Sequence, residues 1–253
     1  MIVRERQNKY VMIEQDHHAQ ISGQLAANLK DSFFIEETWK QSVLYAIKNH
    51  DYAWKMLDKQ PFWNDQKHEP YMFTDIPNSA KTVFYKHGID EIEKHDPYAS
   101  MLCSEHYTRF LIDDPKEESQ SFVRHERERQ QKLIQNMESY DKDIFDVHYG
   151  LLQFFDSLSL YICLNEPGAA KENEHPFFID GIPVPKPLTF FHTNKVGIYW
   201  KDTETVEMDV FPFGSPIDIT IRQKAVPQKA IAENGLINSY EQAEYETVSI
   251  QLL

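Results

Sequence analysis

The spacing of apolar residues divides the chain into a helical first part and a β-rich second part. Between about residues 15 and 165 the apolar positions recur every three or four residues, which is typical of amphipathic helices on a shared core. We expect these helices at residues 16–29, 36–58, 79–94, 97–112, 119–140 and 143–165. From residue 177 onward, β-branched and aromatic segments lie between Pro and Gly turns. This second pattern predicts strands, among them 196–200, 217–221 and 247–250.

Two further segments complete the predicted fold. Residues 1–14 have the pattern of a short hairpin, and residues 59–78, rich in Pro and aromatics, predict a long ordered loop. Asp96 followed by Pro97 predicts a helix N-cap and first helical residue. The predicted class is therefore mainly α, and α+β overall. It has a helical core over 1–165 and an appended antiparallel β layer over 166–253 that packs on the core.

Composition and charge narrow the classes of partner. The chain has 253 residues, 41% of them hydrophobic, and a formal charge of −14, which disfavours nucleic acid and anionic membranes. A small phosphorylated substrate stays compatible, because a metal can meet its charge locally. Cys103 and Cys163 lie in apolar helical contexts and predict buried free thiols. With no signal-peptide pattern and no apolar stretch near ~20 residues, we expect a cytoplasmic protein.

Asp156 is the most unusual residue of the helical part, because it lies inside the apolar run 151–164. An ionised carboxylate is rarely buried without a compensating charge or metal. The upstream chain offers three imidazoles as partners, His18, His50 (next to Asp51) and His106.

The helical positions of these residues favour a shared site. His18 precedes Ile21 by three residues, and His106 has Leu102 and Phe110 four residues to either side, so both imidazoles face the core. His50 and Asp51 fall inside the helix predicted over 36–58. Alone, each His is most simply a satisfied core residue, and Asp156 a partner of Lys or Arg. Together, four helices that each direct a His or Asp inward predict a metal site.

The same residues resemble a known superfamily. His18, His50-Asp51 and Asp156 are similar to the His…His-Asp…Asp pattern of the HD-domain superfamily of metal-dependent phosphohydrolases. Four segments also resemble a bacterial family known only as a domain of unknown function: Gln15-Asp16-His17-His18-Ala19, His50-Asp51-Tyr52-Ala53-Trp54, Ser104-Glu105-His106 and Phe155-Asp156-Ser157-Leu158-Ser159-Leu160. The resemblance is most specific over residues 2–165 and implies an HD-like helical core.

The resemblance also implies a ligand set. His18, His50, Asp51 and Asp156 would hold one metal, Asp51 could bridge to a second, and His106 would serve a second metal or the phosphate. Binuclear members carry two additional histidines, and three residues compete for the role that His106 leaves open: His87, His125 and His148. One or two ions of Mn, Fe, Ni, Co, Zn or Mg suit such nitrogen and oxygen donors.

The leading functional prediction is a metal-dependent phosphohydrolase acting on a small phosphomono- or diester, such as a nucleotide. Asp51 would orient or deprotonate water, His106 would assist, and Arg109 would neutralise phosphate charge, unless Arg109 simply pairs with Glu105. Two alternatives stay open: an HD-fold diiron oxygenase, and a non-catalytic metal-stabilised binding or regulatory protein. In the latter, the β region either caps the helices or forms a homo-oligomer interface.

Overall fold

Strands from the first and last parts of the chain form one six-stranded sheet in the order β1-β2-β9-β10-β8-β7. The computed structural model describes residues 1–34 and 36–253. The strands are β1 (Ile2–Arg6), β2 (Lys9–Ile13), β7 (Ile198–Trp200), β8 (Thr205–Met208), β9 (Ile217–Pro227) and β10 (Tyr245–Leu252). The expected N-terminal hairpin is confirmed, and it continues into the C-terminal strands through β2 and β9. The β8–β10 pair is parallel, where a wholly antiparallel layer was expected.

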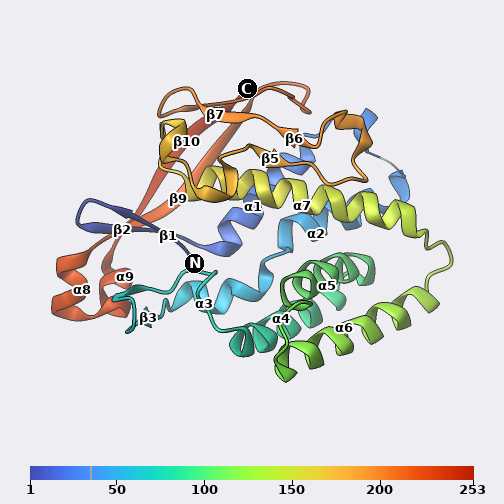
Figure 1. Ribbon diagram of the computed structural model, residues 1–253, viewed down its shortest axis with the longest axis horizontal. Helices are drawn as coiled ribbons and strands as arrows, with labels where there is room; N and C mark the ends of the chain where they lie inside the picture. Colours follow the sequence, from blue (N-terminus) through green and yellow to red (C-terminus); the bar gives the residue numbers. More distant parts are fainter. Residues whose placement is uncertain (35) are drawn as a thin grey trace.

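Long helices make up most of the remaining structure, as the periodicity predicts, and the mainly helical α+β class is confirmed. Figure 1 shows α4, α5 and α6 grouped on the side of the molecule away from the sheet. The helices are α1 (Gln15–Ala27), α2 (Lys40–Asn49), α3 (Lys55–Lys59), α4 (Asn78–Glu93), α5 (Pro97–Leu111), α6 (Glu117–Gln135) and α7 (Lys142–Leu164). Asp96 caps α5 by accepting from the Ala99 N–H, as predicted.

Two helix boundaries differ from expectation. The helix predicted over 36–58 stops at Asn49 and resumes only as the 3-10 turn η3 (Tyr52–Trp54) and α3. Helix α1 begins one residue before Asp16, and the carboxylate of Asp58 accepts the Asp16 N–H at 3.1 Å. This carboxylate satisfies a backbone donor that the first turn of a helix leaves free.

Two short helices, α8 (Gln228–Asn234) and α9 (Leu236–Gln242), connect β9 to β10 and were not anticipated. The long loop over 59–78 contains the small strands β3 (Trp63–Asn64) and β4 (Glu69–Pro70), and a second small pair is formed by β5 (Ile182–Pro183) and β6 (Lys195–Val196). None of the helices in the described ranges combines the length and apolar character needed to cross a bilayer.

The main apolar core lies around α7, which packs against α1, α2 and α5. Strand β2 separates this core from a smaller one, because successive side chains of a strand point to opposite faces. Ile13 faces the main core, while Tyr10 and Met12 join a cluster covered by α8 and α9. Cys103 and Cys163 are buried and free, as expected, and burial raises the pKa of both thiols.

The close packing of α1 on α2 depends on Gly23. A Cβ atom at this position would lie 2.6 Å from the Cβ and 2.9 Å from the Cα of Lys48, nearer than such atoms approach. The absence of a side chain at Gly23 therefore allows a short distance between α1, which contains His18, and α2, which ends at His50.

We predict that Gly23→Ala lowers the free energy of unfolding by about 1–3 kcal/mol, because the added methyl group forces the two helices apart. Gly214→Ala is the matched control, since a Cβ there meets nothing within 4 Å. The control should change stability by less than about 0.5 kcal/mol. Urea unfolding followed by circular dichroism measures both, and equal effects of the two substitutions would contradict the packing argument.

Candidate metal centre

The site begins where α2 ends, at His50. Its Nδ1 donates a hydrogen bond of 2.8 Å to the Ile47 carbonyl, one of the acceptors that the last turn of a helix leaves free. Because a carbonyl only accepts, Nδ1 carries a proton, and Nε2 of the neutral ring carries a lone pair. The backbone leaves the helix at Asp51, with φ −107° and ψ 23°. The prediction of a continuous helix through His50 and Asp51 is therefore wrong, and the helix end itself orients both side chains.

The Nε2 atom of His50 faces two carboxylates. It lies 3.3 Å from Oδ1 of Asp156 and 3.9 Å from Oδ2 of Asp51. It is buried and has no partner with hydrogen-bond geometry within the described ranges. A lone pair and two anionic oxygens repel one another in a buried space unless a proton or a metal ion lies between them.

His18 enters the same space from the buried face of α1. Its Nδ1 lies 2.8 Å from Oγ of Ser159, and that hydroxyl donates to the backbone carbonyl of Asp156 at 3.0 Å. With the proton on Nδ1, His18 donates to the serine oxygen and Nε2 carries the lone pair that a metal needs; with the proton on Nε2, the ring donates to Asp51 instead. This Nε2 lies 2.9 Å from Oδ2 of Asp51 and 3.9 Å from Oδ1 of Asp156.

Both carboxylates stay ionised in spite of their burial. Burial by itself raises the pKa of Asp51, but His50 and His18 outweigh it and lower that pKa. Burial also raises the pKa of Asp156, but His50 outweighs it and lowers that pKa to about 2. Gln15 donates to Oδ2 of Asp51 at 2.9 Å and holds this carboxylate in place.

His106, on α5, closes the site from the third side. Its ring meets the ring of His50 edge to face at 5.2 Å, and its ligand atom lies within 4.8 Å of those of His50 and Asp156. Burial is the main cause that lowers the pKa of His106 to about 4. His106 is therefore neutral at physiological pH, in the form that can bind a metal or accept a proton.

These five residues supply the nitrogen and oxygen donors that suit a divalent ion. Within the described residues, two groups have the spacing of a metal site: His18 with His50 and Asp51, and His50 with His106 and Asp156. Both groups include His50, and because its Nδ1 donates to the Ile47 carbonyl, Nε2 is the atom of His50 that could bind an ion. The prediction of one or two ions stays a prediction, and nitrogen and oxygen donors of this kind are typical of first-row metals.

The competing histidines lie elsewhere. His87 and His125 have side chains about half exposed, beside Glu91 and Glu126 respectively. His148 is buried and its Nδ1 lies 2.7 Å from the hydroxyl of Tyr98. None of the three belongs to either candidate metal group in the ranges that the structure describes.

Arg109 forms the pair with Glu105 that the sequence left open, with 2.7 Å between Nε and Oε1. The other oxygen of Glu105 binds Arg127, so one buried carboxylate anchors two guanidinium groups. The side chain of Arg109 is 55% exposed and its guanidinium lies over the ring of Tyr149 at 5.4 Å. The alternative of a Lys or Arg partner for Asp156 is not found among the described ion pairs, which join Asp156 to imidazoles.

Three supporting residues were missed by sequence reasoning: Gln15, Ser22 and Ser159. Ser22 lies 2.6 Å from the hydroxyl of Ser159 and steadies the group that orients His18. A signal was available for two of them. Gln15 precedes His18 by three residues and Ser159 follows Asp156 by three, so each shares a helix face with a ligand.

Comparison with known proteins gives a family but no activity. The chain belongs to the family described as "Protein of unknown function (DUF3891)", whose model matches residues 1–228. A search of curated proteins and a search of solved structures gave no match. All five proposed ligands lie inside the matched residues.

The site predicts competition between a proton and the metal at His50. Burial lowers the pKa of His50, but the carboxylates of Asp51 and Asp156 outweigh it and raise the pKa to about 9. In the metal-free protein the protonated ring therefore adds stability that is fully present below about pH 6.5 and lost as pH rises through about 9. Metal affinity has the opposite trend, because the ion displaces this proton.

Calorimetric titration with Mn²⁺ between pH 6.5 and 8.5 should show affinity rising by up to about tenfold per pH unit. His50→Gln should abolish strong binding and remove its share of the pH-dependent stability of the metal-free protein. A metal affinity that is constant over this range would contradict the proposed role of His50.

Proposed function

We propose that this chain binds one divalent metal ion through His18, His50, Asp51 and Asp156 and hydrolyses a phosphate ester of a small molecule. The observation that carries the proposal is the meeting of two imidazole Nε2 atoms with two ionised carboxylates in a buried space. The resemblance of the same residues to the HD-domain superfamily supports it. A divalent ion in such a site polarises a phosphoryl oxygen and lowers the pKa of water toward ~7.

The residues of the chain divide the remaining tasks. Asp51 is ionised, accepts hydrogen bonds from Gln15 and faces Nε2 of His18. It is placed to orient the attacking water and to accept its proton. The neutral ring of His106 can bind the ion from the α5 side or take over that proton. By accepting the Nδ1 proton of His18, Ser159 would keep the lone pair on Nε2 available to the ion.

Asp156 is the most exposed of the proposed ligands, so we expect a substrate to approach from its side. The side chains of His18 and His50 are fully buried, whereas that of Asp156 is 14% exposed. Gln153, Ser157 and Leu160 share this face of α7 and are half-buried. Because so little of the site is exposed, only a small group of a substrate could reach the ion from this side. This favours a terminal phosphate over a bulky polymer.

Arg109 supplies positive charge one helical turn beyond His106. Its Nε is held by Glu105, and no described contact occupies its two Nη groups. A guanidinium fixed in this way can donate two hydrogen bonds to a phosphate oxygen or to a second anionic group of the substrate.

The first test of the proposal is hydrolysis by metal-loaded protein. Protein loaded with Mn, Fe, Co, Ni, Zn or Mg should release nitrophenol from p-nitrophenyl phosphate or from bis-p-nitrophenyl phosphate. Asp156→Asn should lower kcat/KM by more than about 100-fold, beyond the usual cost of losing an outer-shell partner of a metal ligand. His87→Ala, which changes an exposed imidazole, is the control and should retain activity.

Two other outcomes identify the alternatives. Aerobically purified protein with two irons, a diiron spectroscopic signal and oxygen consumption would favour an oxygenase and contradict hydrolysis. Stoichiometric metal binding without turnover of any phosphate ester would favour a metal-stabilised binding protein.

The role of Arg109 has a separate test. Arg109→Ala should raise KM about tenfold, the value of one charge-assisted hydrogen bond, and leave metal affinity unchanged. The fold should tolerate the change because Glu105 keeps Arg127. Arg124→Ala removes a similarly exposed guanidinium elsewhere on the surface, paired with Glu117, and should not change KM. Equal KM values for the two variants would contradict a role of Arg109 in substrate binding.

A further inference from the structure

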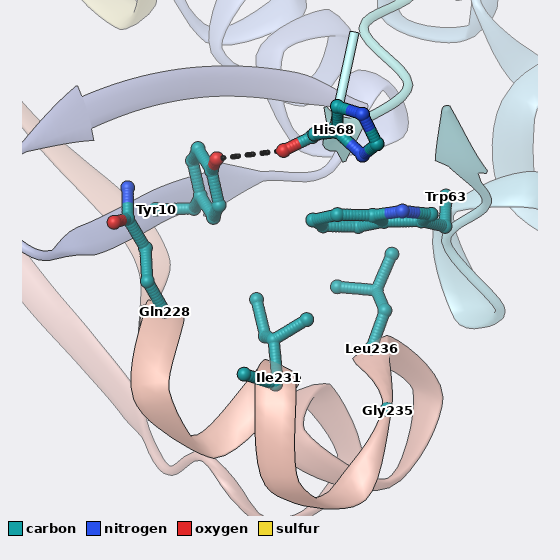
Figure 2. Close-up of a pocket in the computed structure, with 8 residues that line it drawn as sticks. Tyr10, Trp63, His68, Gln228, Ile231, Gly235 and Leu236 are labelled. Carbon is teal, nitrogen blue, oxygen red and sulfur yellow. Dashed lines mark hydrogen bonds between the residues drawn. The ribbon is translucent and has the colours of Figure 1, made fainter. Parts of the chain in front are cut away.

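We infer that a pocket beside Trp63 binds a flat aromatic molecule that is neutral or positively charged. The pocket has a volume of about 510 Å³ and lies between β2, the β3–β4 hairpin and the two short helices α8 and α9 (Figure 2). Sites for small molecules usually have about 300–1,000 Å³. None of its lining residues belongs to the candidate metal centre.

The walls of the pocket are aromatic and aliphatic. Figure 2 shows the ring of Tyr10 facing the indole of Trp63 across the opening, with Ile231 and Leu236 on the helical side. Three of these side chains are at most 8% exposed and are therefore fixed by packing against their neighbours: Tyr10, Ile231 and Leu236. The hydroxyl of Tyr10 donates to the His68 carbonyl at 3.4 Å, a long contact that bridges two walls.

Backbone contacts fix the two sides independently. On the hairpin side, the His68 N–H donates to the Asn64 carbonyl at 2.8 Å. On the helical side, the N–H of Gln228 donates to the Asn8 carbonyl at 2.8 Å, and its side chain donates to Glu5 at 2.8 Å. The space between the sides is therefore preformed, which lowers the entropic cost of binding.

The charge around the pocket selects against anions. The lining includes no Lys, Arg, Asp or Glu. Glu5 lies opposite Tyr10 in the β1–β2 register, and Glu69 belongs to the β3–β4 hairpin. Burial, followed by these two carboxylates, raises the pKa of Tyr10, which agrees with a negative local potential. Aromatic faces in such a potential favour flat rings and cations over anions.

The pocket also extends beyond the family match. Tyr10, Trp63 and His68 lie within the matched residues 1–228, whereas Ile231 and Leu236 follow them. Apart from Gln228, the last matched residue, the helical wall is therefore supplied by a segment that the family match does not include.

Three probes of similar shape and different charge test the inference: quinoline, N-methylquinolinium and quinoline-6-carboxylate. The chain has four tryptophans, so its indole N–H groups give four nitrogen-15 NMR signals, and Trp63→Phe identifies the one from Trp63. Quinoline and N-methylquinolinium should shift this signal and leave the other three unchanged. The carboxylate should bind about tenfold more weakly, because of like-charge repulsion.

Two substitutions on α8 provide the control pair. Ala232 lines the pocket at its exposed edge, and Ala232→Phe should fill the pocket and abolish the shift. Lys229→Phe places the same ring on a position whose side chain is 86% exposed and does not line the pocket, and it should bind as the unmodified chain does.

The inference is overturned if neither quinoline nor N-methylquinolinium shifts the Trp63 signal, if the carboxylate binds as tightly as quinoline, or if Ala232→Phe has no effect. Asp156→Asn should retain probe binding, because the pocket and the metal centre share no residue. Failure of the hydrolase proposal therefore leaves this test unaffected.

Discussion

The structure depends on one electrostatic constraint at its centre, where two carboxylates and two imidazole rings are buried together. Without a cation, this arrangement costs several kcal/mol of desolvation and repulsion. In the metal-free protein, a proton on His50 supplies part of the positive charge that the two carboxylates require. The pKa of this ring is raised for the same reason. A divalent ion meets it more completely, because it can engage Asp51, Asp156 and His18 as well. The family of the chain has no assigned activity, and this centre is the part of the fold that most directly implies one.

The fold brings these groups together by using helix ends and helix faces in different ways. The end of α2 orients His50, because the ring satisfies a carbonyl of its own last turn. Helix α7 contributes twice, since Asp156 faces the site and Ser159, one turn later, orients His18. Gly23 allows α1 and α2 to approach closely enough for their two imidazoles to meet. The six-stranded sheet contributes none of these residues, and it contains both the first strand, β1, and the last strand, β10, of the described chain.

Sequence reasoning picked out candidate residues that the structure brings close together, because helical spacing indicates which residues share a buried face. It could not place the end of α2, because the helical spacing of buried residues continues to Trp54 although the backbone leaves the helix at Asp51. It missed Gln15 and Ser159 as partners, since their hydrogen bonds join residues 36 and 141 positions apart. Helices α8 and α9 are seven residues each, too short to display a repeating apolar period. The parallel β8–β10 pair was missed because local patterns do not encode strand order.

The ionisation of both carboxylates has a consequence for the sequence of events in the proposed reaction. Asp51 and Asp156 carry two negative charges, and with the proton on His50 the metal-free site has a formal charge of about −1, which repels a phosphate dianion. A divalent ion that displaces the His50 proton would cancel the two carboxylate charges, and the two guanidinium groups on Glu105 would then leave the surroundings positive by about one unit. In the proposed reaction, the metal would therefore bind first and the substrate second. Excess substrate without metal would not occupy the site, and the occupied site would hold its metal more tightly.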